Sequence, residues 1–486
     1  MTLSALFPEH KALPSTEVAG ITDNSKEVGP GYVFFAVKGH TVDGHDFIPA
    51  AIKQGAAAIV TQQDIAPLNV SVIKVPDIAA AMARAACAFY GNPAQSLNVI
   101  GITGTKGKTS ISYLLESILQ TAGKSSGVFG TINYRAAGKV LAPAPNTTPA
   151  ALTLQKMIKQ AKDAGVKVLV SEVSSHALEL KRVQGINFNT AVFTNLQRDH
   201  LDFHETFENY FAAKKKLFEN LISPQNTKKN NTAIINIDDE YGQKLAAFLE
   251  GKIRVITCSL QNKADFTAAD IRPSLDGVTF KINGQGARIN LLGRHNVYNA
   301  LAAVAAAHTL GINLETATEG LAALKGVPGR MERVDLGQGF YVFVDFAYTN
   351  ESMQKAFEVV AQFKKGKIFI VFGCGGQRDR TKRPLMGQTA VKNADFVFLT
   401  NDNPRAEDQK QIFADILAGM QGAQNYKVIP DRRAAIQEAI QAAGKNDIVI
   451  IAGKGHEDYQ ILPAGKIHFS DREEAAAAIK KYVYKS

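Results

Sequence analysis

The sequence predicts an α/β fold built from three domains. Its 486 residues exceed what one ordinary hydrophobic core holds, so two to four domains are expected. Short apolar, strand-like runs alternate with helical patterns along most of the chain, which is typical of parallel sheets covered by helices. Asn92-Pro93 and Gly326–Gly329 interrupt this alternation. We therefore expect a small N-terminal α/β domain at 1–95, a central domain at 96–329 and a C-terminal domain at 330–486.

The composition is that of a globular protein, with 45% hydrophobic and 21% charged residues. No apolar run approaches the roughly 18 residues of a membrane span, and the N-terminus lacks the basic and apolar regions of a signal peptide. The 3 cysteines are too few and too far apart to indicate a disulfide framework or a zinc site. We expect a monomer in a reducing, cytoplasmic setting, without a membrane partner.

The net charge of +10 has two interpretations. It is compatible with nucleic-acid binding, but the basic residues are dispersed and no Lys/Arg block is interleaved with aromatic residues. A basic cleft for small polyanionic substrates explains the excess equally well. We therefore expect small-molecule substrates and no nucleic-acid partner.

The first segment has strand-like runs at 33–37, 57–60 and 70–73, between alanine-rich helical stretches. This pattern predicts a small α/β unit. The polar run Gly39–His45 predicts a loop, either purely structural or one that grips a ligand, and composition alone does not decide between them.

The central segment opens with a phosphate cradle. The apolar run 97–100 predicts a buried strand, Gly101–Ser110 a glycine-rich turn, and the periodic residues that follow a helix. Glycines let backbone N–H groups approach a polyphosphate at the helix N-terminus. Lys108 is placed to reach the β- and γ-phosphates and Thr109 to hold Mg²⁺. Ile102 stands where the common pattern has glycine, but the Gly-Lys-Thr ending favours a P-loop ATPase-type domain over a plain turn.

Further central strands are expected at 168–173, 190–194 and 233–236, in a mainly parallel sheet. Glu172 closes the first of these strands, and His200 follows the second. Glu172 has the alternative of a solvated acid at a strand end. We favour adjacent strands that deliver Glu172 and His200 to one rim, where they would hold Mg²⁺ for phosphoryl transfer.

The last segment predicts a Rossmann-like domain, with strands at 341–345, 368–373, 396–400 and 448–453. Ligands collect at the carboxyl ends of such strands, so the loops after the last three should converge on one site.

These three loops carry both signs of charge. Arg378 and Arg405 can clamp a carboxylate, while Asp402 and Glu457 can hold an ammonium group. Surface ion pairs, each worth about 0–1 kcal/mol, are the alternative. We favour a site for an amino acid or another zwitterion. With ATP in the central domain, the natural inference is an ATP-dependent amide ligase that phosphorylates a carboxylate before an amine displaces the phosphate.

The loop from Thr103 to Thr109 resembles that of the Mur ligases and the folylpolyglutamate synthetases. Motifs over nearly the whole chain make the resemblance to the Mur ligase family specific. They are Asn146-Thr147-Thr148-Pro149, Glu172–Leu178, Thr194–His204, Asn296-Val297-Tyr298-Asn299, Pro328–Val334 and the three C-terminal loops.

The resemblance implies three domains and a ligase of peptidoglycan precursor synthesis. ATP would phosphorylate the D-glutamyl carboxylate of UDP-MurNAc-L-Ala-D-Glu, and the amine of a diamino acid would then attack through a tetrahedral intermediate. The positions implied for UDP-MurNAc-dipeptide are Ser25, His40, Thr41, Val42, Asn146, Thr147, Thr148, Ser174 and Arg182. Those implied for ATP are Gly104, Thr105, Lys106, Gly107, Lys108, Thr109, Ser110, Asn296, Arg330 and Asp345.

Lys214 matches the lysine that is carbamylated in this family, although its helical pattern by itself predicts a solvated side chain. As N6-carboxylysine it would join Thr109, Glu172 and His200 in holding Mg²⁺. The resemblance thus implies Lys108, Glu172, His200 and Lys214 as catalytic residues.

The motif Asp402-Asn403-Pro404-Arg405 resembles that of the members that add meso-diaminopimelate. This substrate has a distal carboxylate that lysine lacks, and lysine would leave buried arginine charge unpaired. The implied diaminopimelate positions are Arg378, Asp402, Asn403, Pro404, Arg405, Gly453 and Glu457. An L-lysine-adding ligase is the alternative of the same class, and a P-loop ATPase or switch without ligation is that of a different class.

Two residues depart from the family pattern. Tyr348 stands where histidine is usual, and Lys106 stands where asparagine is usual. The additional lysine either tightens ATP binding or points outward.

Overall fold

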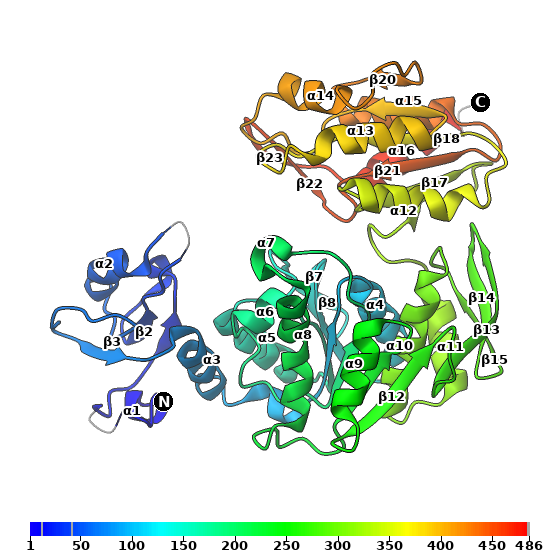
Figure 1. Ribbon diagram of the computed structural model, residues 1–486. Helices are drawn as coiled ribbons and strands as arrows, with labels where there is room; N and C mark the ends of the chain where they lie inside the picture. Colours follow the sequence, from blue (N-terminus) through cyan, green and yellow to red (C-terminus); the bar gives the residue numbers. More distant parts are fainter. Residues whose placement is uncertain (11–12, 40–41, 484–486) are drawn as a thin grey trace. The chain divides into compact units, whose positions relative to one another are not determined.

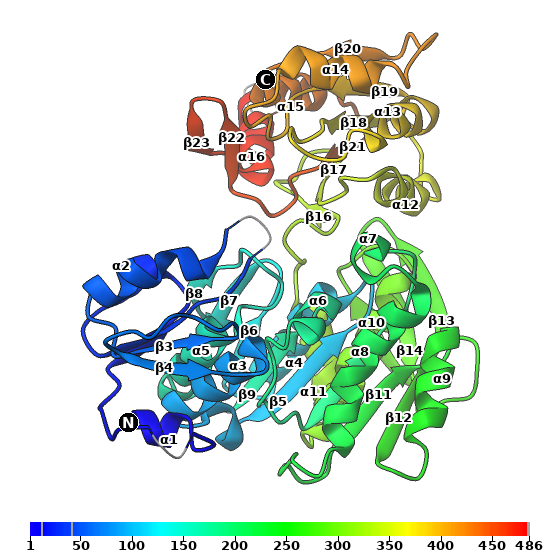
Figure 2. The ribbon, with the colours of Figure 1, turned by 60° about the vertical axis from the view of Figure 1, so that its left-hand side comes forward.

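A computed structural model describes residues 1–10, 13–39 and 42–483 of the chain. The chain divides into two compact units, whose helices and strands are labelled in Figures 1 and 2. The first unit comprises Met1–Ala268 and Tyr298–Leu321, and the second comprises Ala269–Val297 and Ala322–Ser486.

The N-terminal part of the first unit is a parallel sheet of order β1-β2-β3-β4. Side chains alternate between the faces of a strand, so Val33 and Phe35 of β2 pack on one side while Phe34 packs on the other. Helices cover both faces, which explains why every residue of β3 and all but the first of β2 are buried. The elements are α1 (Leu3–Leu6), β1 (Gly20–Thr22), η1 (Ser25–Glu27), β2 (Tyr32–Phe35), η2 (Gly44–Phe47), α2 (Ile48–Lys53), β3 (Ala58–Thr61), β4 (Ser71–Lys74) and α3 (Ile78–Phe89).

The larger sheet of the first unit has the order β12-β11-β10-β5-β9-β6-β7-β8. It is parallel from β12 to β6, as predicted. The strands β7 and β8 at this end of the sheet are antiparallel. Sequence reasoning missed them because β7 is mostly polar in sequence and the apolar run of β8 is short and largely exposed. The strands are β5 (Asn98–Thr103), β6 (Ser126–Phe129), β7 (Asn133–Ala136), β8 (Lys139–Pro143), β9 (Val168–Glu172), β10 (Thr190–Phe193), β11 (Thr232–Asn236), β12 (Arg254–Ser259) and β13 (Phe266–Ser274), whose first residues pair with β12.

Helices pack on this sheet through its alternating side chains. Val99 of β5 and Leu169 of β9 belong to a core that includes Ile158 of α5, Leu217 of α8 and Leu245 of α9. The helices of this region are η3 (Pro93–Ser96), α4 (Lys108–Thr121), α5 (Ala151–Asp163), α6 (Ser175–Glu179), α7 (Leu201–His204), α8 (Phe207–Ile222), α9 (Glu240–Leu249), α10 (His295–Thr309) and α11 (Leu314–Ala323).

The expectation that adjacent strands deliver Glu172 and His200 is wrong. Strand β5 pairs with β9 on one side and with β10 on the other. The strand that carries the phosphate loop therefore lies between the two strands in question. Strands that follow one another in the chain need not be neighbours in the sheet. In a doubly wound sheet the strand order reverses beside the first strand, here β5, so that later strands lie on both sides of it.

The second unit contains a sheet of order β16-β17-β21-β18-β19-β20. It is parallel except for β16. One face packs on α12, α13 and α14 and the other on α15 and α16. The elements are β14 (Gly277–Ile282), β15 (Gln285–Ile289), β16 (Glu332–Arg333), β17 (Tyr341–Asp345), α12 (Asn350–Ala361), β18 (Ile368–Phe372), α13 (Lys382–Asn393), β19 (Phe396–Leu399), α14 (Gln409–Leu417), β20 (Tyr426–Val428), α15 (Arg432–Ala442), β21 (Ile448–Ala452), β22 (Tyr459–Leu462), β23 (Gly465–His468) and α16 (Asp471–Tyr482).

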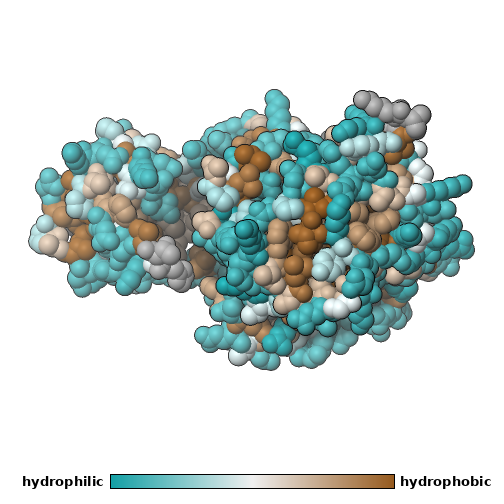
Figure 3. All heavy atoms as spheres, turned by 90° about the horizontal axis from the view of Figure 1, so that it is seen from above, coloured by the Kyte–Doolittle hydropathy of each residue, from teal (hydrophilic) through white to brown (hydrophobic). Residues whose placement is uncertain are grey.

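The exposed apolar side chains are spread over both units, for example Val140, Phe203 and Ile467. On the face that Figure 3 shows, apolar groups are surrounded by hydrophilic residues. None of the helices in the described part of the chain is long and apolar enough to cross a membrane.

A buried ion pair joins α15 to α16 in the second unit. Arg432 and Asp471 are both 0% exposed, and Arg432 Nη2 donates to Asp471 Oδ2 at 2.7 Å. Arg432 also donates to the carbonyl oxygens of Asn401 at 3.1 Å and Ala452 at 2.9 Å, which follow β19 and end β21. The pair thus also binds the backbone at the ends of β19 and β21.

We predict that Asp471→Ala lowers the free energy of unfolding by about 3–5 kcal/mol, because it leaves a buried guanidinium without a carboxylate. The chain has no tryptophan, so denaturant unfolding is followed by circular dichroism. The control is Glu474→Ala, which removes the partner of the 57% exposed Arg433 and should cost about 1 kcal/mol or less. Equal losses in the two variants would contradict the prediction.

Candidate functional site

The phosphate loop connects β5 to α4, and glycines are required at two of its positions. Gly104 has a φ of +141°, and a Cβ there would lie 1.8 Å from Thr194 Oγ1. Gly107 has a φ of +96°, and a Cβ there would lie 2.4 Å from Asn299 Oδ1. The loop therefore packs closely against its neighbours, and it leads into the N-terminus of α4, where backbone N–H groups suit a phosphate.

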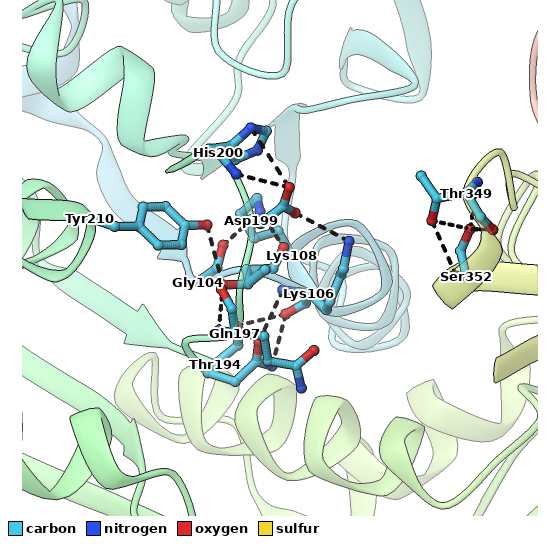
Figure 4. A network of polar contacts seen from close by, with 12 residues as sticks. Gly104, Lys106, Lys108, Thr194, Gln197, Asp199, His200, Tyr210, Thr349 and Ser352 are labelled. Carbon is cyan, nitrogen blue, oxygen red and sulfur yellow. Dashed lines mark hydrogen bonds and ion pairs between the residues drawn. The ribbon is translucent and has the colours of Figure 1, made fainter. Parts of the chain in front are cut away.

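The lysine and threonine of the loop point in different directions. Lys108 Nζ donates to the carbonyl oxygens of Gly104 at 2.7 Å and Thr105 at 3.1 Å, so it lies across the loop (Figure 4). Thr109 Oγ1 donates to Glu172 Oε2 at 3.0 Å. The structure thus brings the end of the phosphate loop to the end of β9.

Glu172 is 1% exposed, so the alternative of a solvated acid is wrong. Its carboxylate accepts hydrogen bonds from the hydroxyls of Ser112 at 3.3 Å and Thr131 at 2.8 Å, and from the Thr131 N–H at 3.3 Å. Gly130 makes room for it, since a Cβ there would lie 2.1 Å from Glu172 Oε1. The charge is compensated by neutral donors, and within the described ranges no cationic side chain pairs with it.

A carboxylate beside threonine and serine hydroxyls is a hard oxygen donor set, which suits Mg²⁺. Among the described residues there is no group of three or more His, Cys, Asp or Glu side chains that would hold a metal by themselves. The residues at this point therefore fit a cation that receives the remainder of its ligands from phosphate and water.

His200 precedes α7 with left-handed backbone, at a φ of +54°. Its N–H donates to Asp199 Oδ1 at 3.1 Å, and Asp199 Oδ2 pairs with Lys106 Nζ at 3.3 Å (Figure 4). Partial burial and the charge of Lys108 lower the pKa of His200, against the effect of Asp199. A neutral imidazole is the form that binds metals. The Lys106 side chain is 60% exposed and contacts this loop.

Lys214 is 1% exposed, which corrects the expectation of a solvated side chain. Its Nζ donates to the Gly104 carbonyl at 3.1 Å and lies 4.3 Å from the centre of the Tyr210 ring. Burial and the charge of Lys108 lower the pKa of Lys214 well below its usual value. The helical pattern of α8 placed the residue on a helix, but only the packing shows that this position faces the phosphate loop.

Tyr210 was missed by the sequence analysis. It is 1% exposed, and its hydroxyl lies 3.2 Å from Thr105 Oγ1 (Figure 4). It therefore contacts both the phosphate loop and the buried amine, and its place one turn before Lys214 on α8 was the available signal.

Three of the positions implied for the muramoyl dipeptide are linked by hydrogen bonds at the end of β9. Thr148 Oγ1 donates to the Glu172 carbonyl at 2.8 Å and accepts from Ser174 N at 3.1 Å. Arg182 Nη1 donates to the Thr148 carbonyl at 3.0 Å, and Thr147 Oγ1 lies 3.1 Å from Thr131 Oγ1. Asn146 is exposed and its carbonyl accepts from Tyr134.

Of the implied uridine positions, Ser25 begins η1 and is half-buried, and Val42 is 54% exposed. His40 and Thr41 lie outside the described residues.

Three of the implied ATP positions, Asn296, Arg330 and Asp345, belong to the second unit, whereas the phosphate loop belongs to the first. Asn296 Nδ2 donates to the Leu292 carbonyl at 2.7 Å. Arg330 lies over the Phe346 ring at 5.5 Å. Asp345 Oδ2 accepts from Met331 N at 2.6 Å, and burial raises the pKa of Asp345 to about 6.

Tyr348 is 49% exposed and meets the Phe346 ring edge-on at 4.9 Å.

The loops after β18, β19 and β21 come together, because these strands are neighbours in the sheet. Gly376 N donates to the Asn403 carbonyl at 2.9 Å, and Asn403 Nδ2 donates to Glu457 Oε2 at 2.9 Å. Burial raises the pKa of Asp402, which is 8% exposed. Gly453 has a φ of +117°, and a Cβ there would lie 2.7 Å from Asp402 Oδ2. Pro404 is buried.

Arg378 and Arg405 flank Gly375. A Cβ on this glycine would lie 3.1 Å from Arg405 Nη1 and 3.7 Å from Arg378 Cγ. Arg405 Nη1 donates to the carbonyl oxygens of Gly376 at 2.9 Å and Asn403 at 3.3 Å. No carboxylate in the described part of the chain forms an ion pair with either arginine, so these two side chains do not fit the alternative of surface ion pairs.

Lys454 was also missed. Its side chain is 0% exposed, and its Nζ lies 3.2 Å from Glu457 Oε2 and donates to Asn403 Oδ1 at 3.3 Å. It holds two of the implied diaminopimelate positions in place. The glycines on both sides of it indicated a loop, and a loop lysine is ordinarily exposed.

Comparison with protein families gives three matches along the chain. Residues 17–90 match "Mur ligase family, catalytic domain", residues 102–307 match "Mur ligase middle domain", and residues 329–455 match "Mur ligase, glutamate ligase domain".

Curated relatives are similar over nearly the full chain. The chain is 45% identical over 470 residues to the UDP-N-acetylmuramoyl-L-alanyl-D-glutamate--2,6-diaminopimelate ligase of Geobacillus thermodenitrificans, covering 96% of this chain and 95% of the relative. It is 42% identical over 486 residues to the enzyme of the same name from Geobacter metallireducens, covering 96% and 94%.

Solved structures agree. A structure of a UDP-N-acetylmuramoyl-L-alanyl-D-glutamate--2,6-diaminopimelate ligase has a TM-score of 0.70 at 33% identity and covers 99% of both chains. The MurF ligase of Thermotoga maritima, in complex with ADP, has a TM-score of 0.63 at 21% identity, covers 97% of this chain and 98% of its own, and shows the shared fold. These matches confirm the predicted three-domain α/β fold, and the chain belongs to the Mur ligase family.

Proposed function

We propose that this chain is an ATP-dependent ligase that adds meso-2,6-diaminopimelate to UDP-MurNAc-L-Ala-D-Glu in peptidoglycan precursor synthesis. The observation that carries the proposal is the pair Arg378 and Arg405, which flank one glycine and have no carboxylate partner in the described part of the chain. The names of the relatives at 42–45% identity support the same substrates. The proposal includes a monomer in the cytoplasm, where ATP is available, and the domain boundaries 1–95, 96–329 and 330–486.

The reaction balances in two steps. The D-glutamyl carboxylate attacks the γ-phosphorus of ATP, and the bond to the β–γ bridging oxygen breaks. The products of this step are ADP and an acyl phosphate. The neutral amine of diaminopimelate then attacks the carbonyl carbon and forms a tetrahedral intermediate. Phosphate departs with the electron pair of its C–O bond, the nitrogen loses a proton, and an amide remains.

The phosphate loop is assigned to ATP. Its glycines allow the backbone to approach the polyphosphate, and Lys108 is within reach of any phosphate that replaces the Gly104 and Thr105 carbonyls as its partner. Asn296, Arg330 and Asp345 are assigned to the nucleoside side by family resemblance. Asn146, Thr147, Thr148, Ser174 and Arg182 are assigned to the muramoyl dipeptide, and Ser25, His40, Thr41 and Val42 to the uridine nucleotide.

The residues that would hold Mg²⁺ are Thr109, Glu172, His200 and Lys214 as its carbamate. When bound, Mg²⁺ neutralises phosphate charge and favours phosphoryl transfer. Only an unprotonated amine combines with CO₂. Burial lowers the pKa of Lys214 well below its usual value, which favours the unprotonated form and so supports the carbamate. Its product is a buried carboxylate beside the phosphate loop.

Diaminopimelate is assigned to the loops after β18, β19 and β21. Arg378 and Arg405 meet its distal carboxylate as a bidentate clamp, and Asp402 and Glu457 meet its ammonium group. Lysine would leave both guanidinium groups without a carboxylate, which disfavours it.

The deciding experiment supplies the purified chain with ATP, Mg²⁺ and UDP-MurNAc-L-Ala-D-Glu, and measures phosphate release with meso-diaminopimelate or with L-lysine. We expect release with diaminopimelate. Release with lysine alone would identify the lysine-adding alternative, and release that needs no amino acid would identify an ATPase without ligation.

Arg405→Ala should raise the KM for diaminopimelate roughly 10- to 100-fold, as expected for the loss of a charge-assisted clamp. The KM for ATP should change little, since Arg405 is not one of the positions assigned to ATP. Steady-state kinetics for each substrate test this. An unchanged KM for diaminopimelate would refute the assignment of Arg405.

Lys214→Ala should lose most activity, and acetate or another small carboxylate should restore part of it by occupying the space of the carbamate. Lys216→Ala is the control, because Lys216 lies on the same helix but pairs with Glu179 at the surface. Full activity of Lys214→Ala without added carboxylate would exclude the carbamate.

A further inference from the structure

Two loops of the second unit are bent by residues with left-handed backbone. Gln377, which directly precedes Arg378, has a φ of +54°, and Arg405 has a φ of +57°. This region is unfavourable for residues that carry a Cβ, and such residues persist in it only where the surroundings hold them. The directions of both arginines therefore depend on whatever fixes these two bends.

Glu407 fixes the first bend. Its Oε2 accepts the Gln377 N–H at 2.6 Å, although Glu407 belongs to the loop that carries Arg405. The two loops are also joined by the Gly376 N–H, which donates to the Asn403 carbonyl at 2.9 Å. One carboxylate thus connects the backbone next to Arg378 with the loop of Arg405.

Arg383 holds Glu407 in turn. Its side chain is 0% exposed, and Nη1 and Nη2 donate to the two carboxylate oxygens of Glu407 at 2.6 and 2.9 Å. Nη1 also donates to Asp415 Oδ2 at 2.8 Å, and Nη2 to the Gly375 carbonyl at 3.2 Å. The hydrogen bonds from Arg383 and from the Gln377 N–H lower the pKa of Glu407 to about 2, so that it is ionised at neutral pH.

We propose that Arg383 and Glu407 are positioning residues of the amino-acid site, which set the separation of Arg378 and Arg405 and thereby the affinity for the substrate carboxylate. Both oxygens of Glu407 are used by Arg383 and Gln377, so Glu407 acts through the two loops and not by contact with the amino acid. This inference rests on the proposed function, because it needs the two arginines to bind diaminopimelate.

The test is Glu407→Gln, which removes the charge and keeps the size of the side chain. We expect a KM for diaminopimelate roughly tenfold higher or more, since a charge-assisted network is lost. The kcat and the KM for ATP should stay within about twofold, because the loss is one of binding. The preference for diaminopimelate over lysine should fall, since the clamp recognises the distal carboxylate.

A second variant guards against misfolding. Glu407→Asp keeps a charge for Arg383 but shortens the reach to the Gln377 N–H, and should raise the same KM. The matched control is Glu474→Gln, which neutralises the partner of Arg433 in the same unit, outside the three loops. It should leave all three constants unchanged.

The outcomes separate the two proposals. A wild-type chain that releases no phosphate with diaminopimelate would overturn the proposed function. A wild-type chain that does so, with folded Glu407→Gln and Glu407→Asp variants whose KM for diaminopimelate is unchanged, would overturn the positioning role alone. A lowered melting temperature without a change in KM would show that the network only stabilises the unit.

Discussion

The burial of charge at the carboxyl ends of parallel strands is the constraint on which both units depend. Parallel strands all end at the same edge of their sheet, so the loops that follow them gather polar and charged side chains in one place. Glu172 and Asp402 are 1% and 8% exposed there. Removing a charge from water costs free energy unless hydrogen bonds or an opposite charge replace the solvent. The contacts of each buried charged group therefore show what stabilises it.

The two units meet this constraint in different ways. In the first, Glu172 is held by hydroxyls and one N–H, and Lys214 by a carbonyl and an aromatic ring. Within the described ranges, neither the Glu172 carboxylate nor the Lys214 amine forms an ion pair. In the second unit, Arg383 and Lys454 are paired with acids, whereas within the described ranges Arg378 and Arg405 have no carboxylate. These ion pairs stabilise the loops at the carboxyl ends of the strands.

Close packing of backbone limits which residues stand at these strand ends. Gly104, Gly130 and Gly453 each lie where a Cβ would come within 3 Å of a side chain of the site. Non-glycine residues with left-handed backbone, such as His200 and Arg405, occur in the loops after two other strands, β10 and β19. Backbone in this conformation is held by hydrogen bonds and packing from neighbouring segments, and these contacts link loops that are distant in the chain.

The sequence pattern located the central strands of both sheets and the chemistry of the loops that follow them. Apolar runs bounded by glycine and proline located the strands, because a strand buried on both faces admits few polar residues. The phosphate loop was evident from its glycines, because glycine lets the backbone approach a ligand more closely than other residues do. Motifs over the whole chain then indicated the family, and with it Lys214.

The order of the strands and the burial of the charged side chains depend on the tertiary structure. The sequence placed Glu172 and His200 on neighbouring strands, but β5 lies between β9 and β10, because strand order is set by the path of the connections and not by position in the chain. The burial of Lys214, Lys454 and Arg383 likewise depends on the tertiary structure. A lysine or arginine in a helix or loop is ordinarily solvated, and its burial depends on partners from distant segments, which no local pattern reveals.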